Sequence, residues 1–313
     1  MKLITSELDL IMLTFDEPNK ELNWAHTQTI APWSKRVDGV VGFDSAHKAA
    51  ASLSDTEYLI TVDGDNVLSA EFLELELDVP EQFKNHVLSW NSYNPVNGLV
   101  YGNGGVKIWP KHYIEQMRTH ENSTDPVAEL DFCWADTYLQ LNNVYSQTNI
   151  NASPLQAFRA GFREGCKMTL DRGKIVTDPT NIEHVMYSGN LTRMLIWGSI
   201  GADVENGVAA ILGTRIGMWY TNILSGDISI VRDYGAFNAY AQTYINMSVP
   251  DMVELATQIG DFISADTGIQ FQDISAQHSA FFKRCYPKHP SFSDPLVTES
   301  SVLSLSKFQP HAT

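Results

Sequence analysis

Two apolar segments near the start of the chain, each ending abruptly in acidic residues, constrain the fold most. The run LDLIMLTF, from Leu8 to Phe15, ends in Asp16-Glu17-Pro18, and YLITV ends in Asp63-Gly64-Asp65-Asn66. Nearly continuous apolar runs of this length are typical of strands buried on both faces of an α/β sheet. Ligands of such sheets bind outside the carboxyl ends of the strands. The two segments therefore predict a binding site where these strands end.

The residues between the two runs predict how the chain is wound. Residues 21–29 have a helical pattern, RVDGVVGF is a short strand, and DSAHKAAASLS is a helix with Asp44 or Ser45 as its N-cap. Strand, helix, strand, helix and strand in this order predict a doubly wound α/β sheet. Later segments predict a helix with Ser153 as N-cap and helical patches beyond residue 217.

Composition limits the compartment and the partners. The 313 residues carry a net charge of −16, from 37 acidic and 21 basic residues, which argues against non-specific adhesion to DNA or to anionic membranes. Cys133, Cys166 and Cys285 lack the spacing of a metal site and are interpreted as reduced thiols. With neither a signal peptide nor a long apolar run, we expect a cytoplasmic protein without membrane association.

Asp63 and Asp65 are the first candidate ligands for a metal ion. An Asp-x-Asp pattern alone is common by chance, but here it directly follows an apolar strand and encloses a glycine. Two carboxylates at that position suit a hard divalent cation, Mn²⁺ or Mg²⁺, that carries phosphate oxygens. The alternative is a plain Asp-Gly turn in which Asp65 or Asn66 caps the next element.

The segment YGNGGVKIWPK is a second candidate. Gly104 and Gly105 can expose backbone N–H groups, and Lys107 can reach a phosphate. The alternative is a hairpin turn, because Asn-Gly favours one.

The segment ELDFCWADTYLQ is a third candidate. It places Glu129, Asp131 and Asp136 among aromatic and apolar residues, where an acid could act as a general base. The alternative is a solvated acidic helix face.

Two further patterns involve basic residues. Arg159 and Arg163 in AFRAGFREG lie four residues apart on one helical face, which suits a phosphate or a carboxylate, or else salt bridges to nearby acids. His184 is a lone histidine, and most such residues are not ligands.

Taken together, TFDEP, GFDSAHKAAA, VDGDN and ELDFCWADT resemble the nucleotide-binding half of a GT-A glycosyltransferase, with VDGDN matching the DxD motif of that family. The segments GNGGVKIWPK, SPLQAFRAGFREGCKM and WGSIGADVENGVAAILGTRIG are similar to glycosyltransferase-like proteins of large tailed bacteriophages. The resemblance covers residues 8–216. It implies a GT-A, Rossmann-like mixed sheet flanked by helices over residues 1–216, and a mainly helical extension over 217–313.

The resemblance also implies roles by position. Asp63 and Asp65, completed by His184, would hold the metal; Asp16 or Glu17 would lie near the nucleobase; and His47 or Lys48 would approach the diphosphate. The catalytic base would lie between Glu129 and Asp136, although the plain Glu-Asp pair common in the family is missing.

The function implied is transfer of a sugar from a nucleotide sugar, UDP-sugar first, to an acceptor hydroxyl. The phage resemblance favours hydroxymethylpyrimidine in DNA, with Trp90, Tyr93 or Trp109 as the stacking partner of a flipped base. The alternatives are a glycan or protein acceptor, a nucleotidyltransferase, and a non-catalytic sugar-binding protein. A nucleotidyltransferase usually has an early glycine-rich loop, and residues 14–22 contain no glycine.

Overall fold

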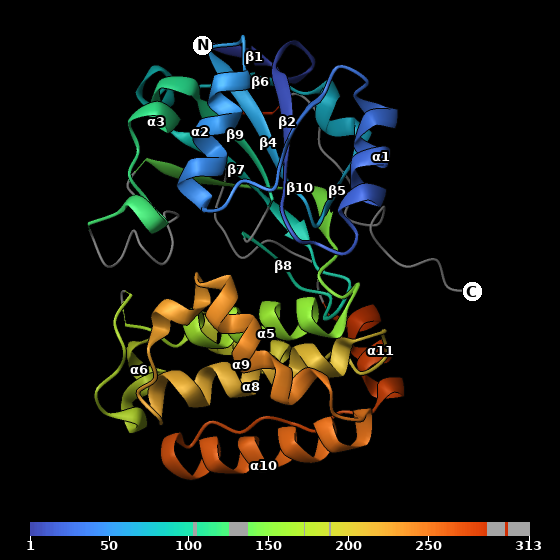
Figure 1. Cartoon of the computed structure of the whole chain (residues 1–313), viewed down its shortest axis with the longest axis vertical. Helices are drawn as coiled ribbons and strands as arrows, with labels where there is room; N and C mark the ends of the chain where they lie inside the picture. The colour runs from blue at the N-terminus through green and yellow to red at the C-terminus, as the bar shows by residue number, and fades with distance from the viewer. Residues whose placement is uncertain (103–104, 125–136, 172, 188, 287–297, 300–313) are drawn as a thin grey trace. The chain divides into compact units, whose positions relative to one another are not determined.

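The computed structural model describes residues 1–102, 105–124, 137–171, 173–187, 189–286 and 298–299 (Figure 1). The chain divides into two compact units, Met1–Asn149 with Pro287–Thr313, and Ile150–Tyr286. The boundary therefore lies at residues 149 and 150. The expected boundary at residue 216 falls inside a helix, because the apolar, glycine-containing segment before it belongs to the helical unit.

The first unit is built on a mixed sheet, as the sequence predicts. Its strands are, in spatial order, β3 (Lys35–Asp38), β2 (Asp9–Thr14), β4 (Tyr58–Asp63), β9 (Val106–Pro110), β7 (Val87–Tyr93), β10 (Tyr138–Thr148) and β5 (Asn66–Leu68); β8 (Val100–Tyr101) pairs with β7. Strands β2, β3 and β4 are parallel. Strand β9 is antiparallel to β4 and to β7, so β7 runs in the direction of β4. Of the strands on either side of YGNGG, β8 pairs with β7, and β9 pairs with β7 and β4.

Helices cover both faces of this sheet (Figure 1). They are α1 (Lys20–Ile30), α2 (Phe43–Leu53) and α3 (Lys111–Gln116), with the short 3₁₀ helices η1 (Thr5–Glu7), η2 (Ala70–Glu74), η3 (Glu81–Phe83) and η4 (His120–Asn122). Alternate residues of a strand point to opposite faces. Leu10 and Ile60 pack in one core cluster with Ala31, directly after α1. Ile11 and Leu59 pack in the other cluster, with α2.

The order of these elements creates a switch in the winding of the sheet. From β2 the chain passes through α1 to β3 on one side, then returns through α2 to β4 on the other side of β2. The carboxyl ends of β2 and β4 therefore flank the point where the strand order reverses, which is where open α/β sheets bind their ligands.

Helix α2 begins differently from the prediction. Its N-cap is Gly42, with φ at 98°, and Asp44 lies inside the helix with its side chain buried. The carboxylate of Glu121 accepts hydrogen bonds from the backbone N–H groups of Asp44 and Ser45, at 3.3 and 2.8 Å. An acid distant in sequence thus satisfies amides that a local cap residue usually satisfies.

A small antiparallel sheet completes the first unit. It consists of β1 (Lys2–Ile4), β6 (Glu76–Asp78) and β11 (Thr298–Glu299), with β6 in the middle. Within EFLELELDVP the strand is Glu76–Asp78, whose two acids are exposed while Leu77 is buried.

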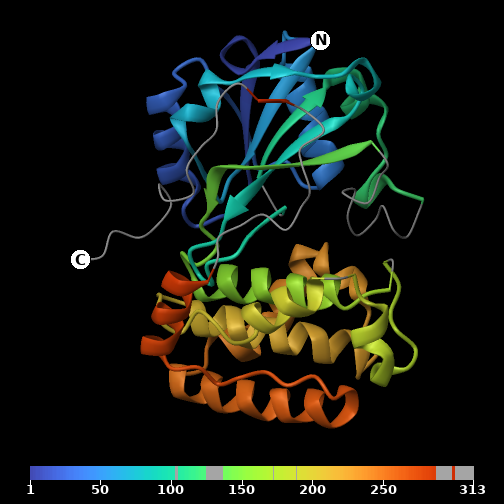
Figure 2. The ribbon, with the colours of Figure 1, turned by 180° about the vertical axis from the view of Figure 1, so that it is seen from behind.

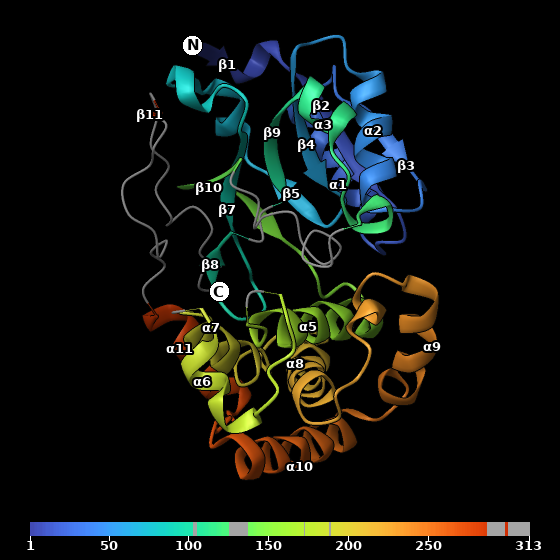
Figure 3. The ribbon, with the colours of Figure 1, turned by 90° about the vertical axis from the view of Figure 1, so that its left-hand side faces the viewer.

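The second unit is helical. It contains α5 (Pro154–Met168), α6 (Ile182–Val185), α7 (Asn190–Trp197), α8 (Gly207–Asn222), α9 (Tyr234–Ile245), α10 (Val249–Thr267) and α11 (Ala276–Cys285), with η6 (Pro179–Asn181) and η7 (Ile228–Val231). Ser153 caps α5 as predicted, accepting a hydrogen bond from the Gln156 N–H. Figure 2 and Figure 3 show α8 lying between α5 and α10.

Glycines bring α5 and α8 into close backbone contact. A Cβ atom added at Gly161 would lie 2.0 Å from the Ala210 carbonyl oxygen, and one at Gly165 would lie 2.1 Å from that of Thr214. The same holds from the other side, where a Cβ at Gly213 would lie 2.2 Å from the Phe158 carbonyl oxygen. The glycines of AFRAGFREG are therefore packing residues of the helical unit.

Candidate site at the carboxyl ends of β2 and β4

The site begins with the turn after β4. Asp63 is the last residue of the strand, and its N–H donates to the Gly105 carbonyl at 2.8 Å. Gly64 and Asp65 form the turn, and Asn66 begins β5. The Asp63 side chain is 38 % exposed and Asp65 is half-buried, so both carboxylates are within reach of solvent.

Asn66 fixes the far side of this turn from within the protein. Its side chain is buried; Oδ1 accepts from Thr148 Oγ1 at 3.1 Å, and Nδ2 donates to Asp65 Oδ1 at 2.7 Å. From the sequence, Asn66 is predicted only as a possible cap, and its position directly after the acid pair is the signal that points to it.

Glu17 supports the turn from the side of β2. Its Oε2 atom accepts from the Phe15 N–H at 2.7 Å, and a Cβ added at Gly64 would lie 2.7 Å from this oxygen. Burial raises the pKa of Glu17, and the negative charges of Asp16 and Asp63 raise it further. Glu17 and Asp63 thus come together as predicted, while Asp16 is exposed.

Lys107 supplies the positive charge at this site. Its Nζ lies 3.8 Å from Asp63 Oδ2, and its side chain is only 8 % exposed. Burial raises the pKa of Asp63, and the nearby ammonium of Lys107 opposes that rise. Gly105 is needed here for space, since a Cβ would lie 2.2 Å from Asn66 Nδ2 and 2.9 Å from Asp63 Cβ. Gly104 lies outside the described residues.

A second charged group lies at the end of β3. Asp38 Oδ1 accepts from Lys20 Nζ and from Thr14 Oγ1, both at 2.7 Å. Arg36 makes two hydrogen bonds to the Glu21 carboxylate, at 2.9 and 2.8 Å. No local sequence pattern indicates this group, because its members are spread over β2, α1 and β3.

His47 and Lys48, the residues predicted to approach the diphosphate, have different surroundings. His47 is buried, its Nδ1 lies 2.9 Å from the Phe43 carbonyl oxygen, and its ring lies 4.9 Å from that of Trp109. Burial lowers its pKa to about 3. A neutral, buried ring is unsuited to contact a diphosphate, so this predicted role finds no support in the geometry.

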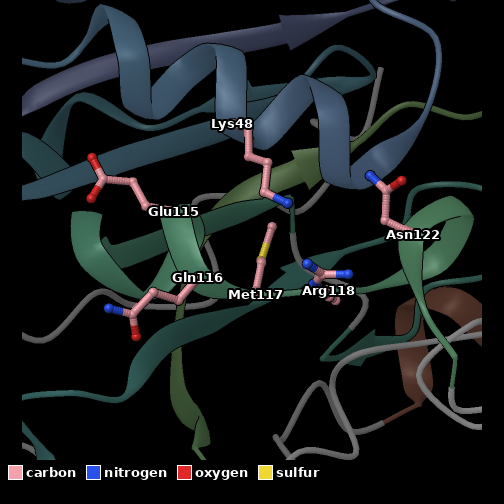
Figure 4. Close-up of a pocket in the computed structure, with 6 residues that line it drawn as sticks. All are labelled: Lys48, Glu115, Gln116, Met117, Arg118 and Asn122. Carbon is pink, nitrogen blue, oxygen red and sulfur yellow. The ribbon is translucent and has the colours of Figure 1, made fainter.

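Lys48 lines a pocket of about 510 Å³ instead (Figure 4). Its Nζ donates to Asp44 Oδ2 at 2.7 Å, and Asn122 Nδ2 donates to the same oxygen at 2.7 Å. In Figure 4 the nitrogen-bearing ends of Lys48, Arg118 and Asn122 lie around one space, and Met117 stands beside Lys48 and Arg118. Asp44 neutralises the lysine, which leaves Arg118 as the exposed cation of this pocket.

Arg159 and Arg163 have partners within the helical unit. The Arg159 guanidinium lies 4.5 Å from the centre of the Tyr234 ring, and Arg163 donates to the Val231 carbonyl. Both arginines therefore hold η7 and the start of α9 against α5.

The aromatic residues expected to stack on a flipped base are core residues. Trp90 and Trp109 are fully buried and Tyr93 is 2 % exposed. Trp90 packs edge-on against Phe72, and Trp109 Nε1 donates to Thr61 Oγ1 at 2.8 Å. These three residues lie in strands β7 and β9 and are buried in the sheet, so they cannot stack on a flipped base. The predicted bases Glu129, Asp131 and Asp136 lie outside the described residues.

The predicted metal ligands are Asp63, Asp65 and His184. Among the residues that the structure describes, no three His, Cys, Asp or Glu side chains group as a metal site. His184 is exposed on the short helix α6 of the second unit. Asp63 and Asp65 still fit a hard cation that completes its shell with phosphate oxygens and water, since Mg²⁺ is commonly held by one or two carboxylates.

Comparisons with protein-family models, curated proteins and solved structures gave no match to this chain.

Within the described part of the chain, every helix is too short or too polar to span a membrane.

Proposed function

We propose that the chain is a glycosyltransferase of the GT-A type that binds a nucleoside-diphosphate sugar at the carboxyl ends of β2 and β4. The observation that carries the proposal is the Asp63-Gly64-Asp65 turn, which lies at the end of β4 where the strand order reverses around β2. Open α/β sheets bind nucleotides at this kind of position. The resemblance of VDGDN to the DxD motif points the same way.

The acidic and basic residues of the site would bind different parts of the donor. Asp63 and Asp65 would hold Mn²⁺ or Mg²⁺, which when bound neutralises the negative charge of the nucleoside diphosphate. Lys107 faces the same turn, with its Nζ 3.8 Å from Asp63 Oδ2, and its ammonium would pair with a phosphate oxygen of the bound nucleotide. Glu17 lies beside the turn and accepts a hydrogen bond from the Phe15 N–H.

The acceptor half of the reaction needs a base within reach of a hydroxyl group. An acidic side chain would deprotonate that hydroxyl as it attacks the anomeric carbon. We propose Glu129, Asp131 or Asp136 for this role, on the resemblance alone. Hydroxymethylated pyrimidine in DNA remains the first acceptor to test. Its phosphate contacts must be local, because the chain carries a net charge of −16.

A screen of nucleotide sugars with Mn²⁺ tests the proposal. Each nucleotide sugar is incubated with the protein and with hydroxymethylated DNA, plain DNA or a glycan. The products are then identified by mass spectrometry. Sugar transfer, or hydrolysis of the sugar nucleotide without acceptor, supports a glycosyltransferase. Binding without turnover supports a non-catalytic sugar-binding protein. Transfer of the nucleotide itself supports a nucleotidyltransferase.

A further inference from the structure

Helix α1 reaches the acid turn through a buried asparagine. The Asn23 side chain is 2 % exposed, and its Nδ2 donates to the Gly64 carbonyl oxygen at 2.9 Å. Asn23 lies in helix α1, where its backbone carbonyl accepts from Thr27 Oγ1 at 3.0 Å. The buried side-chain amide donates to the middle residue of the turn.

A second asparagine, one helical turn earlier, completes a ring of hydrogen bonds. Asn19 Nδ2 donates to the Asn149 carbonyl oxygen at 2.9 Å, and the Asn149 N–H donates to the Asp65 carbonyl oxygen at 2.7 Å. The ring thus runs from Asn19 through Asn149, Asp65 and Gly64 to Asn23. Residues four apart lie on the same face of a helix, so the segment NKELN presents both amides together.

We infer that Asn23 is the positioning residue of the Asp63-Gly64-Asp65 turn and, with Asn19, sets the direction of its two carboxylates. The backbone of the turn is bound at three places: at the Asp63 N–H by Gly105, at the Gly64 carbonyl by Asn23, and at the Asp65 carbonyl by Asn149. A backbone fixed on both sides of Asp65 leaves the carboxylates little freedom. Ligands held in place before binding lose less entropy when they bind.

This inference rests on the proposed function, because it assigns Asn23 to the metal and nucleotide site. It predicts that loss of the Asn23 amide weakens binding more than it weakens the fold. The changes are Asn23→Leu, which removes the donor, and Asn23→Asp, which keeps the shape but directs a carboxylate oxygen at the Gly64 carbonyl. Thr5→Val is the matched control, because it removes a buried hydrogen bond of the same unit, from Thr5 Oγ1 to the Phe72 carbonyl at 2.6 Å, that involves neither Asn23 nor the turn.

The affinity of each variant for UDP is measured by calorimetry with saturating Mn²⁺, beside its affinity for Mn²⁺ alone and its melting temperature. We expect at least about tenfold weaker UDP binding for both Asn23 variants, and unchanged binding for Thr5→Val at a comparable melting temperature. Asn19→Leu should weaken binding less, and the Asn19→Leu/Asn23→Leu pair should be non-additive, since both belong to one ring.

Two results would overturn the inference in distinguishable ways. If the wild-type chain binds UDP and both Asn23 variants bind it equally well, Asn23 has no positioning role and the proposed function stands. If the wild-type chain binds neither UDP nor Mn²⁺, the proposed function fails and the inference falls with it.

Discussion

The ammonium of Lys107 lies 3.8 Å from Asp63 Oδ2, at the amino end of an antiparallel strand that pairs with the strand carrying the aspartate. The register of β9 on β4 places Lys107 opposite Thr61, two residues before Asp63. The pairing of two strands far apart in the sequence therefore brings an acid and a base together at the proposed diphosphate site.

Replacing Lys107 should weaken nucleotide binding. Lys107→Met removes the cation that lies beside Asp63, and we expect at least about tenfold weaker UDP binding, which corresponds to about 1.4 kcal/mol. Lys107→Arg keeps the charge and should retain more of the affinity. Lys111→Met is the control, because Lys111 Nζ bonds the Ser54 carbonyl at 2.7 Å. Equal UDP affinity of Lys107→Met and the wild-type chain would exclude Lys107 from the site.

Gly64→Ala should destabilise the first unit. The added Cβ would lie 2.7 Å from Glu17 Oε2 and 3.0 Å from the Leu13 carbonyl oxygen, so the neighbours must move. We expect a loss of about 1–3 kcal/mol in the free energy of unfolding, measured in urea. Combining it with Glu17→Ala should give less than the sum of the two losses. Gly235→Ala, where only Asp233 Oδ1 lies near at 3.4 Å, should be nearly neutral, and an equal loss there would contradict this account.

Gly165→Ala should destabilise the helical unit, because its Cβ would meet the Thr214 carbonyl oxygen at 2.1 Å. We expect a loss of about 2–3 kcal/mol in the free energy of unfolding. Arg159→Ala removes the contact with the Tyr234 ring, which alone should cost about 0.5–1 kcal/mol, and should leave the UDP affinity unchanged. A large loss of UDP affinity in Arg159→Ala would restore the phosphate-binding interpretation of AFRAGFREG.

His47 should make the stability of the protein fall in mild acid. Burial holds its pKa at about 3, against 6.5 for an ordinary histidine, so below pH 6.5 the unfolded chain takes up a proton that the folded chain does not. Its contribution is therefore constant above pH 6.5 and falls by about 1.4 kcal/mol per pH unit between 6.5 and 3. His47→Gln should remove this part of the slope in urea unfolding, whereas His112→Gln, at an exposed histidine, should keep it. Parallel pH profiles for His47→Gln and the wild-type chain would show that the ring takes up its proton in the folded state.

The sequence predicts the strands and helices around the site well, because their signals are local. The apolar run Leu8 to Phe15 contains β2, and Ser153 caps α5 as expected. The position of the acids after β2 and β4 is also predictable, because parallel strands end on one edge of a sheet, and Glu17 and Asp63 lie close enough for their charges to interact.

Relationships between distant segments could not be predicted from local patterns. The N–H groups at the start of α2 are bound by Glu121, more than seventy residues away, and Asn23 binds Gly64 from a different helix. Arg159 and Arg163 have the spacing of a phosphate-binding pair, yet the glycines between and beside them pack α5 onto α8. Identical local spacing serves packing or binding, and only tertiary contacts decide between them.

The most direct test of the central claim is a calorimetric titration of the chain with UDP, with Mn²⁺ and after chelation with EDTA. The account predicts metal-dependent binding by the wild-type chain and at least about tenfold weaker binding by Asp65→Ala, whose fold is unchanged. It predicts that Asp55→Ala, at an exposed aspartate paired with Lys35, binds as the wild-type chain does. Equal binding by Asp65→Ala, or UDP binding that is the same in EDTA, would contradict a metal site at the turn after β4.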